Sequence, residues 1–394
     1  MVPCNFWGLK NRRKNSRGRR GAGFFFVFKL QVLFSLWHRT TVEALQTSFR
    51  GTDLPNSSPL LHFPDGRHFM KAIVVTGFNG PDTLELRDVP EPAANEVLVR
   101  IHAAGLNFAD VRAAQGKYPG GPEPPFIAGR EFSGVIESSG ERIMGYSQQN
   151  AFAEKIASSQ NLLFPIPAKW DFEHAAAFPV NYLTAWLAYW KAGLVKTGIE
   201  DTSPVSPSSK KRVLIHAAAG GVGTAAVQIG RQLGLEMFGT ASNDEKISRL
   251  KELGLTHPIN YKQEDYEERI AEITHGEGVD AVFDGLGGEH TGKSIRCCGF
   301  LGRVILFGSA TGENPKVNLG SLYIKGTSLH GLWLSKLVAK KELIDAALSA
   351  MKPWIESGAI QPQVGAVLPL EQAAEAYRML LERRNFGKVV LRLN

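Results

Sequence analysis

The sequence predicts an α/β protein of two domains, in which a β-rich module precedes a doubly wound parallel sheet. Three observations support this prediction. The chain has 394 residues, more than a single hydrophobic core usually holds. Short apolar segments separated by Pro and Gly fill residues 70–145, as expected for strands and turns. After Pro179, apolar strands alternate with amphipathic helices, which indicates βαβ units and helices on both faces of a parallel sheet.

These patterns place the two domains at residues 70–180 and 181–330. In the first domain we expect strands at 71–75 and 96–101. In the second, the expected strands are 213–217, 236–240, 279–283 and 303–307, and the expected helices are 182–190 and 224–233. The remaining residues, 331–394, add two helical stretches and a last strand at 388–393.

The first 69 residues differ in composition from the rest of the chain. Residues 1–50 hold 10 of the 45 Lys and Arg residues and only one acid, Glu43. The formal net charge of +7 therefore belongs to this segment and gives no reason to expect a nucleic-acid partner. Its apolar run, 24–37, is too short to span a bilayer. The segment fits an organellar presequence, a start that mimics a signal peptide, or an unfolded extension before a natural start near Met70.

The expected location follows from the same segment and from the cysteines. We expect a cytoplasmic protein, or a mitochondrial one if residues 1–69 are a presequence. The three cysteines cannot supply a disulfide framework, and adjacent Cys297 and Cys298 are poorly placed to bridge each other. A reducing compartment is the simpler expectation.

A glycine-rich segment joins the first strand of the parallel sheet to its first helix. Glycines at such a turn let backbone N–H groups and the helix N-terminus approach a pyrophosphate. The spacing is not the strict G-x-G-x-x-G, so a packing turn in an ordinary α/β protein is the alternative. The predicted nucleotide-binding residues are Gly220, Gly221, Val222 and Gly223, which follow three alanines.

The end of the second strand predicts which nucleotide binds. A protein that selects NAD usually places an Asp or Glu here to bind the ribose 2′-hydroxyl. In this chain the first acid comes only at Asp244. An uncharged Ser242, followed by Lys246 and Tyr261, would suit a 2′-phosphate, so we predict NADPH rather than NADH. Lys246 alone would be interpreted as a solvated helix residue, and the joint pattern favours the phosphate.

Through these motifs, the chain from about Met70 to Leu393 resembles the medium-chain dehydrogenase/reductase superfamily, specifically its quinone oxidoreductase (zeta-crystallin-like) branch. The resemblance implies a GroES-like β-barrel catalytic domain split around a Rossmann domain, with residues 331–394 returning to the catalytic domain. It also implies a homodimer with its active site in the cleft between the domains. The matching stretches are 107–110, 129–134, 217–223, 259–261, 302–308 and 387–390.

The resemblance also implies site residues. Ser242, Lys246 and Tyr261 match residues that hold the adenosine phosphate. The residues implied along the nicotinamide side are Thr184, Phe307 and Gly308.

Zinc ligands that alcohol dehydrogenases of this superfamily carry are replaced here. Asn107 stands at the position of the first ligand and Arg130 at that of the expected His, and no cysteine lies between Cys4 and Cys297. Metal ligation needs thiolate or imidazole donors at fixed spacing. We therefore predict a zinc-free protein with no metal ligands.

A zinc-free site favours a substrate that accepts hydride readily, such as a quinone, an enone or another activated alkene. We expect Asn107 to donate to the substrate carbonyl oxygen and Tyr118 to donate a hydrogen bond or a proton. The structural alternatives are that Asn107 only holds the turn before Asp110 and that Tyr118 is a loop aromatic. Arg112 departs from the tyrosine that some quinone reductases place near the ring.

A second departure concerns the β-rich domain. Between Gly140 and Arg142 the chain lacks a segment that the family usually has, which puts the stability of this lobe in doubt.

The predicted function is NADPH-dependent reduction of a small-molecule quinone, enone or enoyl substrate. An enoyl-thioester reductase is the nearest alternative, because that branch carries a tyrosine at the place of Tyr118. It would need room for an acyl chain and a basic contact for the carrier phosphate, which the sequence does not show. An NADPH-binding protein without enzymatic activity is an alternative of another class.

Overall fold

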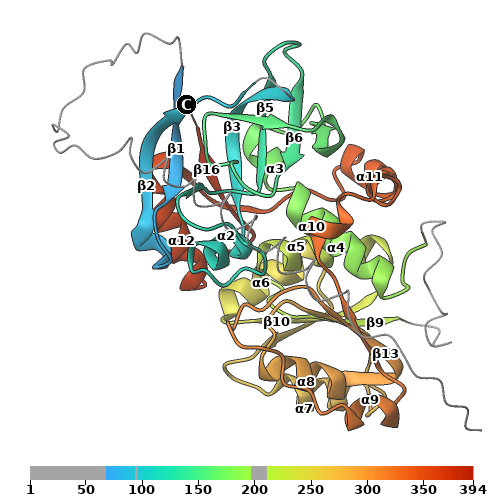
Figure 1. Ribbon diagram of the computed structural model, residues 1–394. Helices are drawn as coiled ribbons and strands as arrows, with labels where there is room; N and C mark the ends of the chain where they lie inside the picture. The colour runs from blue at the N-terminus through green and yellow to red at the C-terminus, as the bar shows by residue number, and fades with distance from the viewer. Residues whose placement is uncertain (1–67, 94–95, 197–210, 394) are drawn as a thin grey trace, which may run out of the picture. The chain divides into compact units, whose positions relative to one another are not determined.

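The computed structural model describes residues 68–93, 96–196 and 211–393, and its strands form three sheets (Figure 1). The extension predicted for residues 1–69 lies almost wholly outside these ranges, so its role stays a prediction. None of the helices in the described ranges is long and apolar enough to cross a membrane.

A six-stranded parallel sheet forms one lobe, with the strand order β11-β10-β9-β12-β13-β14. This confirms the predicted doubly wound parallel sheet. Its strands are β9 (Arg212–Ile215), β10 (Glu236–Ala241), β11 (His257–Asn260), β12 (Val279–Asp284), β13 (Cys298–Leu306) and β14 (Ser328–Gly331). Its helices are α4 (Pro179–Lys191), α5 (Gly221–Gln232), α6 (Asp244–Leu253), α7 (Tyr266–Ile273), α8 (Glu289–Cys297) and α9 (Gly320–Ile324).

The helices cover both faces of this sheet because its strands are apolar on both sides. In Figure 1, α4, α5 and α6 lie on one face and α7, α8 and α9 on the other. Along β9, Val213 and Ile215 join the core under α4 and α5, whereas Leu214 between them joins the core under α7 and α8. Alternate residues of a strand point to opposite faces, so an uninterrupted apolar run produces this burial.

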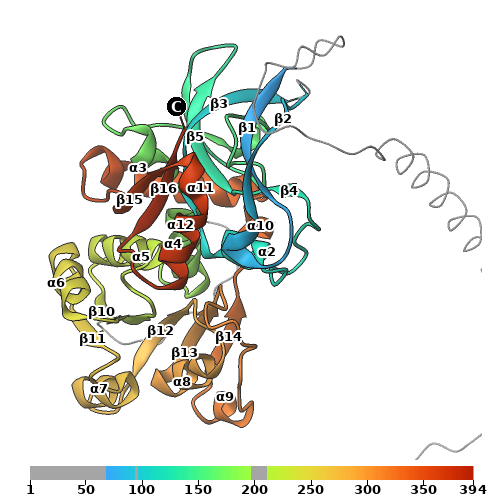
Figure 2. The same cartoon turned by 90° about the vertical axis from the view of Figure 1, so that its left-hand side faces the viewer.

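The second lobe is built on a seven-stranded sheet in which β15 (Val364–Pro369) and β16 (Lys388–Arg392) lie beside strands from the start of the chain (Figure 2). β16 pairs antiparallel with β3, so the chain returns to its first lobe after the parallel sheet. The other strands of this lobe are β1 (Phe69–Val75), β2 (Leu84–Pro90), β3 (Val97–Leu106), β4 (Phe126–Ile127), β5 (Glu131–Ile136), β6 (Arg142–Tyr146), β7 (Lys155–Ser158) and β8 (Leu163–Pro165). Its helices are α2 (Phe108–Ala114), α3 (Phe172–Ala176) and α12 (Ala373–Leu381), with 3-10 turns at Gly80–Thr83, Gln160–Leu162 and Leu370–Gln372. Helices α10 (Leu334–Leu337) and α11 (Lys341–Glu356) pack against α4.

The shortened connection near Gly140 forms a hairpin between β5 and β6. Gly140 has a φ of 74°, in the left-handed region that glycine adopts without strain. Its N–H donates to the Ile136 carbonyl over 2.9 Å, and the two strands pair from Val135 opposite Arg142 onwards. The missing segment is therefore replaced by a tight turn that keeps the strands paired.

One ion pair lies inside the second lobe. Lys388 begins β16 and is 2% exposed, and its Nζ contacts Oε1 of Glu131, which begins β5 and is fully buried. Taking two charges out of water is costly, so such a pair is stable only while both partners and their hydrogen bonds are present.

We expect Glu131→Gln to destabilise the protein by about 3 to 5 kcal/mol, because it leaves the Lys388 ammonium buried without its counter-ion. Urea unfolding of the full chain measures this loss. Asp345→Asn, which removes the exposed ion pair of Lys341 and Asp345, is the matched control and should change stability little. Equal effects of the two variants would show that the buried pair does not hold the lobe.

Candidate active site

Two cavities meet between the parallel-sheet lobe and the strands of the second lobe. The first, of about 380 Å³, follows the glycine-rich loop, and we call it the glycine cavity. The second, of about 440 Å³, contains Tyr118, and we call it the tyrosine cavity. The residues that line both are Asn107, Phe108, Val222 and Ala310.

The glycine-rich loop forms one wall of the glycine cavity. Gly220 and Gly221 line it, and a Cβ on Gly221 would lie 2.6 Å from the side chain of Asn181. Gly220 precedes α5 and provides no side chain to cap its first N–H groups, which leaves them available to an anion. Gly223 lies behind this wall, where a Cβ would collide with the Ala217 carbonyl oxygen. Gly223 therefore permits close packing of the helix and does not itself line the cavity.

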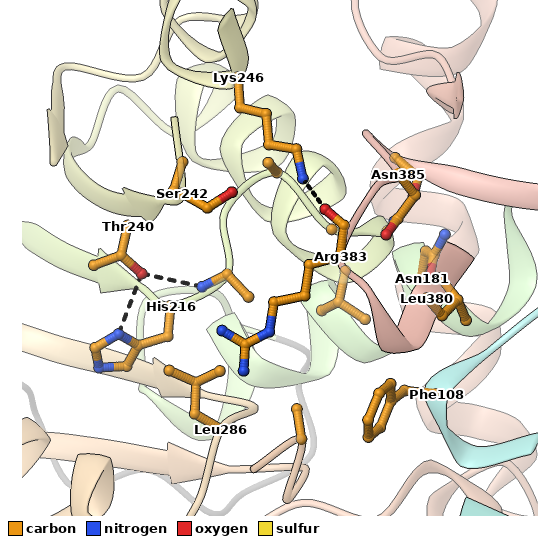
Figure 3. Close-up of a pocket in the computed structure, with 18 of the residues that line it drawn as sticks. Phe108, Asn181, His216, Thr240, Ser242, Lys246, Leu286, Leu380, Arg383 and Asn385 are labelled. Carbon is orange, nitrogen blue, oxygen red and sulfur yellow. Dashed lines mark hydrogen bonds between the residues drawn. The ribbon is translucent and has the colours of Figure 1, made fainter. Parts of the chain in front are cut away.

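Basic and hydroxyl groups gather at the far end of the glycine cavity (Figure 3). Ser242 follows β10, Lys246 lies on α6, and Tyr261 follows β11. Arg383 comes from the C-terminal part of the chain, and its side chain points into the cavity. Lys246 Nζ donates to the Arg383 carbonyl over 2.6 Å, and Arg383 Nη1 donates to the Tyr261 hydroxyl over 3.2 Å.

The electrostatics of this end favour an anion. Burial lowers the pKa of Lys246; the carboxylate of Glu245 opposes this shift, and the guanidinium of Arg383 adds to it. Asp244, the first acid after β10, accepts from Asn260 Nδ2 over 2.8 Å and does not line the cavity. Asp244 therefore does not offer its carboxylate to a ribose hydroxyl in this cavity.

Arg383 was not predicted as a site residue. The sequence gives no signal that distinguishes it from its neighbour Arg384. Only the fold separates them, since Arg384 pairs with Glu375 and Glu382 at the surface.

Tyr266 and His290, which also line the glycine cavity, were missed as well. The hydroxyl of Tyr266 lies 3.0 Å from His290 Nδ1, beside His216. Burial lowers the pKa of His216 to about 4, so its ring is neutral at pH 7.

A chain of hydroxyl groups lines the tyrosine cavity. Trp333 Nε1 donates to the Tyr118 hydroxyl over 2.7 Å. Ser335 Oγ lies 3.1 Å from that hydroxyl and 2.7 Å from the hydroxyl of Tyr146. An indole N–H only donates, so the Tyr118 oxygen accepts from Trp333 and keeps its own proton for Ser335 or for a bound molecule. Trp333, Ser335 and Tyr146 were not predicted from the sequence.

Arg130 lies under this chain. Its guanidinium is 4.0 Å from the centre of the Tyr118 ring, and its Nε is 3.3 Å from Oδ1 of Asp110. Burial raises the pKa of Asp110 to about 6, although Arg130 opposes the shift, so the carboxylate is charged at pH 7. The residue that replaces a zinc-ligand histidine thus forms a buried ion pair and supports the ring of Tyr118.

Asn107 reaches both cavities, but its amide is held by neighbours. Its Nδ2 donates to Glu131 Oε1 over 2.9 Å and to the Gly105 carbonyl over 3.4 Å, and its Oδ1 accepts from Lys388 Nζ over 2.7 Å. Lysine only donates and a carboxylate only accepts, which fixes this orientation of the amide. Because both amide hydrogens have acceptors, the arrangement fits a positioning role better than the predicted donation to a substrate.

The three residues implied along the nicotinamide side all line the tyrosine cavity. Thr184 comes from α4, and Phe307 and Gly308 follow β13. Within the ranges that the structure describes, no group of three or more His, Cys, Asp or Glu side chains is placed to hold a metal ion.

Two protein families match the chain. Residues 93–167 match the alcohol dehydrogenase GroES-like domain, and residues 221–352 match the zinc-binding dehydrogenase family. The first match covers the β-rich lobe and the second covers the parallel sheet, so the GroES-like and Rossmann-type parts predicted from the resemblance are both confirmed.

Similar proteins come from two groups. The synaptic vesicle membrane protein VAT-1 homolog of Homo sapiens is 34% identical over 354 residues, 82% of this chain and 86% of the relative. The quinone oxidoreductase of Sus scrofa is 30% identical over 343 residues, 83% of this chain and 99% of the relative.

Among solved structures, the quinone oxidoreductase of Thermus thermophilus, determined alone and with NADPH, matches with a TM-score of 0.71 and 35% identity. The match covers 82% of this chain and 100% of that one. The chain belongs to the medium-chain dehydrogenase/reductase superfamily, in its quinone oxidoreductase branch.

Proposed function

We propose that the protein is an NADPH-dependent oxidoreductase that reduces quinones or other activated carbonyls and alkenes by hydride transfer, without zinc. The observation that carries the proposal is the junction of the two cavities. A cavity lined by a glycine loop and by the cations of Lys246 and Arg383 shares Val222 and Ala310 with a cavity that holds a hydrogen-bonded tyrosine.

The residues of the glycine cavity fit an NADPH molecule. Ser242, Lys246, Tyr261 and Arg383 offer hydroxyl and cationic donors to the 2′-phosphate, and the loop at Gly220 and Gly221 suits the pyrophosphate. The nicotinamide would then lie beside Thr184, Val222, Phe307 and Gly308. When bound, NADPH supplies the hydride that the reaction needs.

Tyr118 is the group that would supply the proton. As a substrate carbon accepts the hydride, negative charge develops on the carbonyl oxygen, and the Tyr118 hydroxyl donates its proton to it. The donated hydrogen bond from Trp333 and the guanidinium of Arg130 stabilise the phenolate that results. Ser335, which bridges Tyr118 and Tyr146, is placed to return a proton to Tyr118.

A second candidate is an NADPH-binding protein without enzymatic activity. It is supported by the relatives that are named synaptic vesicle membrane proteins, of which one is 34% identical to this chain. The hydroxyl chain around Tyr118 favours the enzyme. The cytoplasmic location and the homodimer remain predictions.

The central prediction is that the purified full chain oxidises NADPH when a quinone, an enone or an enoyl thioester is added. NADPH should be preferred over NADH, because the cationic end of the glycine cavity binds a phosphate, and activity should survive EDTA. Nicotinamide absorbance follows the reaction. Activity that needs zinc or NADH would overturn the interpretation of Asn107, Arg130 and Ser242, and tight NADPH binding without turnover would favour the second candidate.

We expect Tyr118→Phe to lower kcat by about 100-fold or more, because the phenol proton is lost, while the Kd for NADPH stays unchanged. Steady-state kinetics and a fluorescence titration of NADPH give the two values. Tyr323→Phe, at a tyrosine that is 80% exposed on α9, is the control and should behave as the wild type. An unchanged kcat for Tyr118→Phe would rule out its role as proton donor.

NADPH affinity should fall as the pH rises into the alkaline range. Only the protonated Lys246 binds the 2′-phosphate as a cation, and its lowered pKa moves the loss to a lower pH than an ordinary lysine would show. Titrations of Kd against pH measure the effect. Lys246→Arg should keep affinity at high pH, and NADH, which lacks the phosphate, should show no such dependence. The same alkaline loss with Lys246→Arg would assign it to another group.

A further inference from the structure

We infer that the substrate of the tyrosine cavity carries an anionic group, a carboxylate or a phosphate, which Arg112 and Lys117 bind. The inference rests on the proposed function, because it names the substrate class of the same site.

The charges that line the tyrosine cavity are unbalanced. Its basic residues are Arg112, Lys117 and Arg130, and no carboxylate is among the described residues that line it. Arg130 is neutralised by Asp110, at 3.3 Å. Arg112 and Lys117 form no ion pair with any residue that the structure describes, and the side chain of Arg112 donates only to the neutral amide of Gln115, over 3.4 Å. Two positive charges in this cavity thus lack a negative partner.

Local structure keeps these two side chains on one side of the cavity. Arg112 lies in the last turn of α2, and the Lys117 N–H donates to the Arg112 carbonyl over 2.8 Å, which closes the turn between them. The Arg112 guanidinium reaches the loop after β13, where a Cβ on Gly312 would lie 3.1 Å from Nη1. A basic residue at a helix C-terminus also stabilises the helix dipole. That effect does not explain Lys117, which lies beyond the helix and lines the same cavity.

The rest of the lining fits a flat conjugated molecule. Phe108, Phe307 and Trp333 provide aromatic surface, and the hydroxyl of Tyr118 is hydrogen-bonded to Trp333. A substrate whose carbonyl meets Tyr118 and whose anionic group meets Arg112 and Lys117 is held at two points, which orients the carbon that accepts the hydride. A cavity of about 440 Å³ suits a small molecule of this kind.

Two sources of the anionic group share this chemistry. One is a carboxylate on a small enone or quinone. The other is the phosphate of a phosphopantetheine thioester. An enoyl-thioester reductase needs a basic contact for this phosphate, and Arg112 and Lys117 would provide it. The test therefore compares an anionic with a neutral member of each class.

The experiment measures kcat and KM of the full chain for two matched pairs. The first pair is (E)-4-oxopent-2-enoate and its methyl ester, and the second is crotonyl coenzyme A and the crotonyl thioester of N-acetylcysteamine. In at least one pair we expect the anionic member to have a KM about tenfold lower, with a similar kcat, because the charged contact is made equally before and during the reaction. The pair that shows the difference identifies the source.

The variants Arg112→Met and Lys117→Met should raise the KM for the anionic member about tenfold and leave the KM for its neutral partner unchanged. Lys352→Met, at an exposed lysine on α11, makes the same change in net charge and should have no effect. Equal KM values within both pairs, or an equal rise for neutral and anionic members, would overturn the inference while the proposed function stands.

Binding measurements separate a failure of the inference from a failure of the proposed function. The saturated acid 4-oxopentanoate and its methyl ester, and butyryl coenzyme A with the matching N-acetylcysteamine thioester, are titrated calorimetrically into the full chain with NADP⁺. Tighter binding of an anionic member, lost in Arg112→Met and Lys117→Met, supports the inference even if no substrate is reduced. In that case the proposed function is wrong and the inference about the anionic group still holds. Equal binding within both pairs overturns the inference.

Discussion

The buried contact between Lys388 and Glu131 is the interaction on which both cavities depend. The Lys388 ammonium also donates to Asn107 Oδ1, and lies 3.4 Å from Asn181 Oδ1, so one group joins β16, β5, the start of α2 and α4. The residue before it, Gly387, donates its N–H to the Ala219 carbonyl over 2.8 Å, which ties the glycine-rich loop to the same strand. A buried ammonium is tolerated only with all of these acceptors, so the strand, the loop and Asn107 are fixed together.

The basic residues that line the two cavities divide into two kinds by their partners. Lys388 and Arg130 are buried and paired with Glu131 and Asp110, and they hold parts of the fold in place. By contrast, Lys246 and Arg383 face the glycine cavity, and Arg112 and Lys117 the tyrosine cavity, each without a carboxylate among the described residues. Lys246 and Arg112 are partly buried and Lys117 and Arg383 are exposed, and all four cations are available to form charge-assisted hydrogen bonds with an anionic ligand.

The fold could be predicted largely from local patterns. Apolar alternation and helix periodicity predicted the parallel sheet, because strands buried on both faces read as continuous apolar runs such as 213–215. The glycines at 220, 221 and 223 predicted the turn, and a Cβ at Gly221 or Gly223 would collide with Asn181 or with Ala217. The effect of the shortened segment near Gly140 could not be predicted, because pairing between β5 and β6 decides whether the turn closes.

The sequence by itself determined the strand and helix order, the glycine turn and the residue types at the end of β10, because these depend on neighbours in the chain. The tertiary structure decided which side chains share a cavity. Trp333 and Ser335 lie 215 and 217 residues from Tyr118, and Arg383 lies 122 residues from Tyr261, so no local pattern connects them. It also decided that the amide of Asn107 is bound by Lys388 and Glu131, since satisfying buried polar groups depends on every partner that folding brings together.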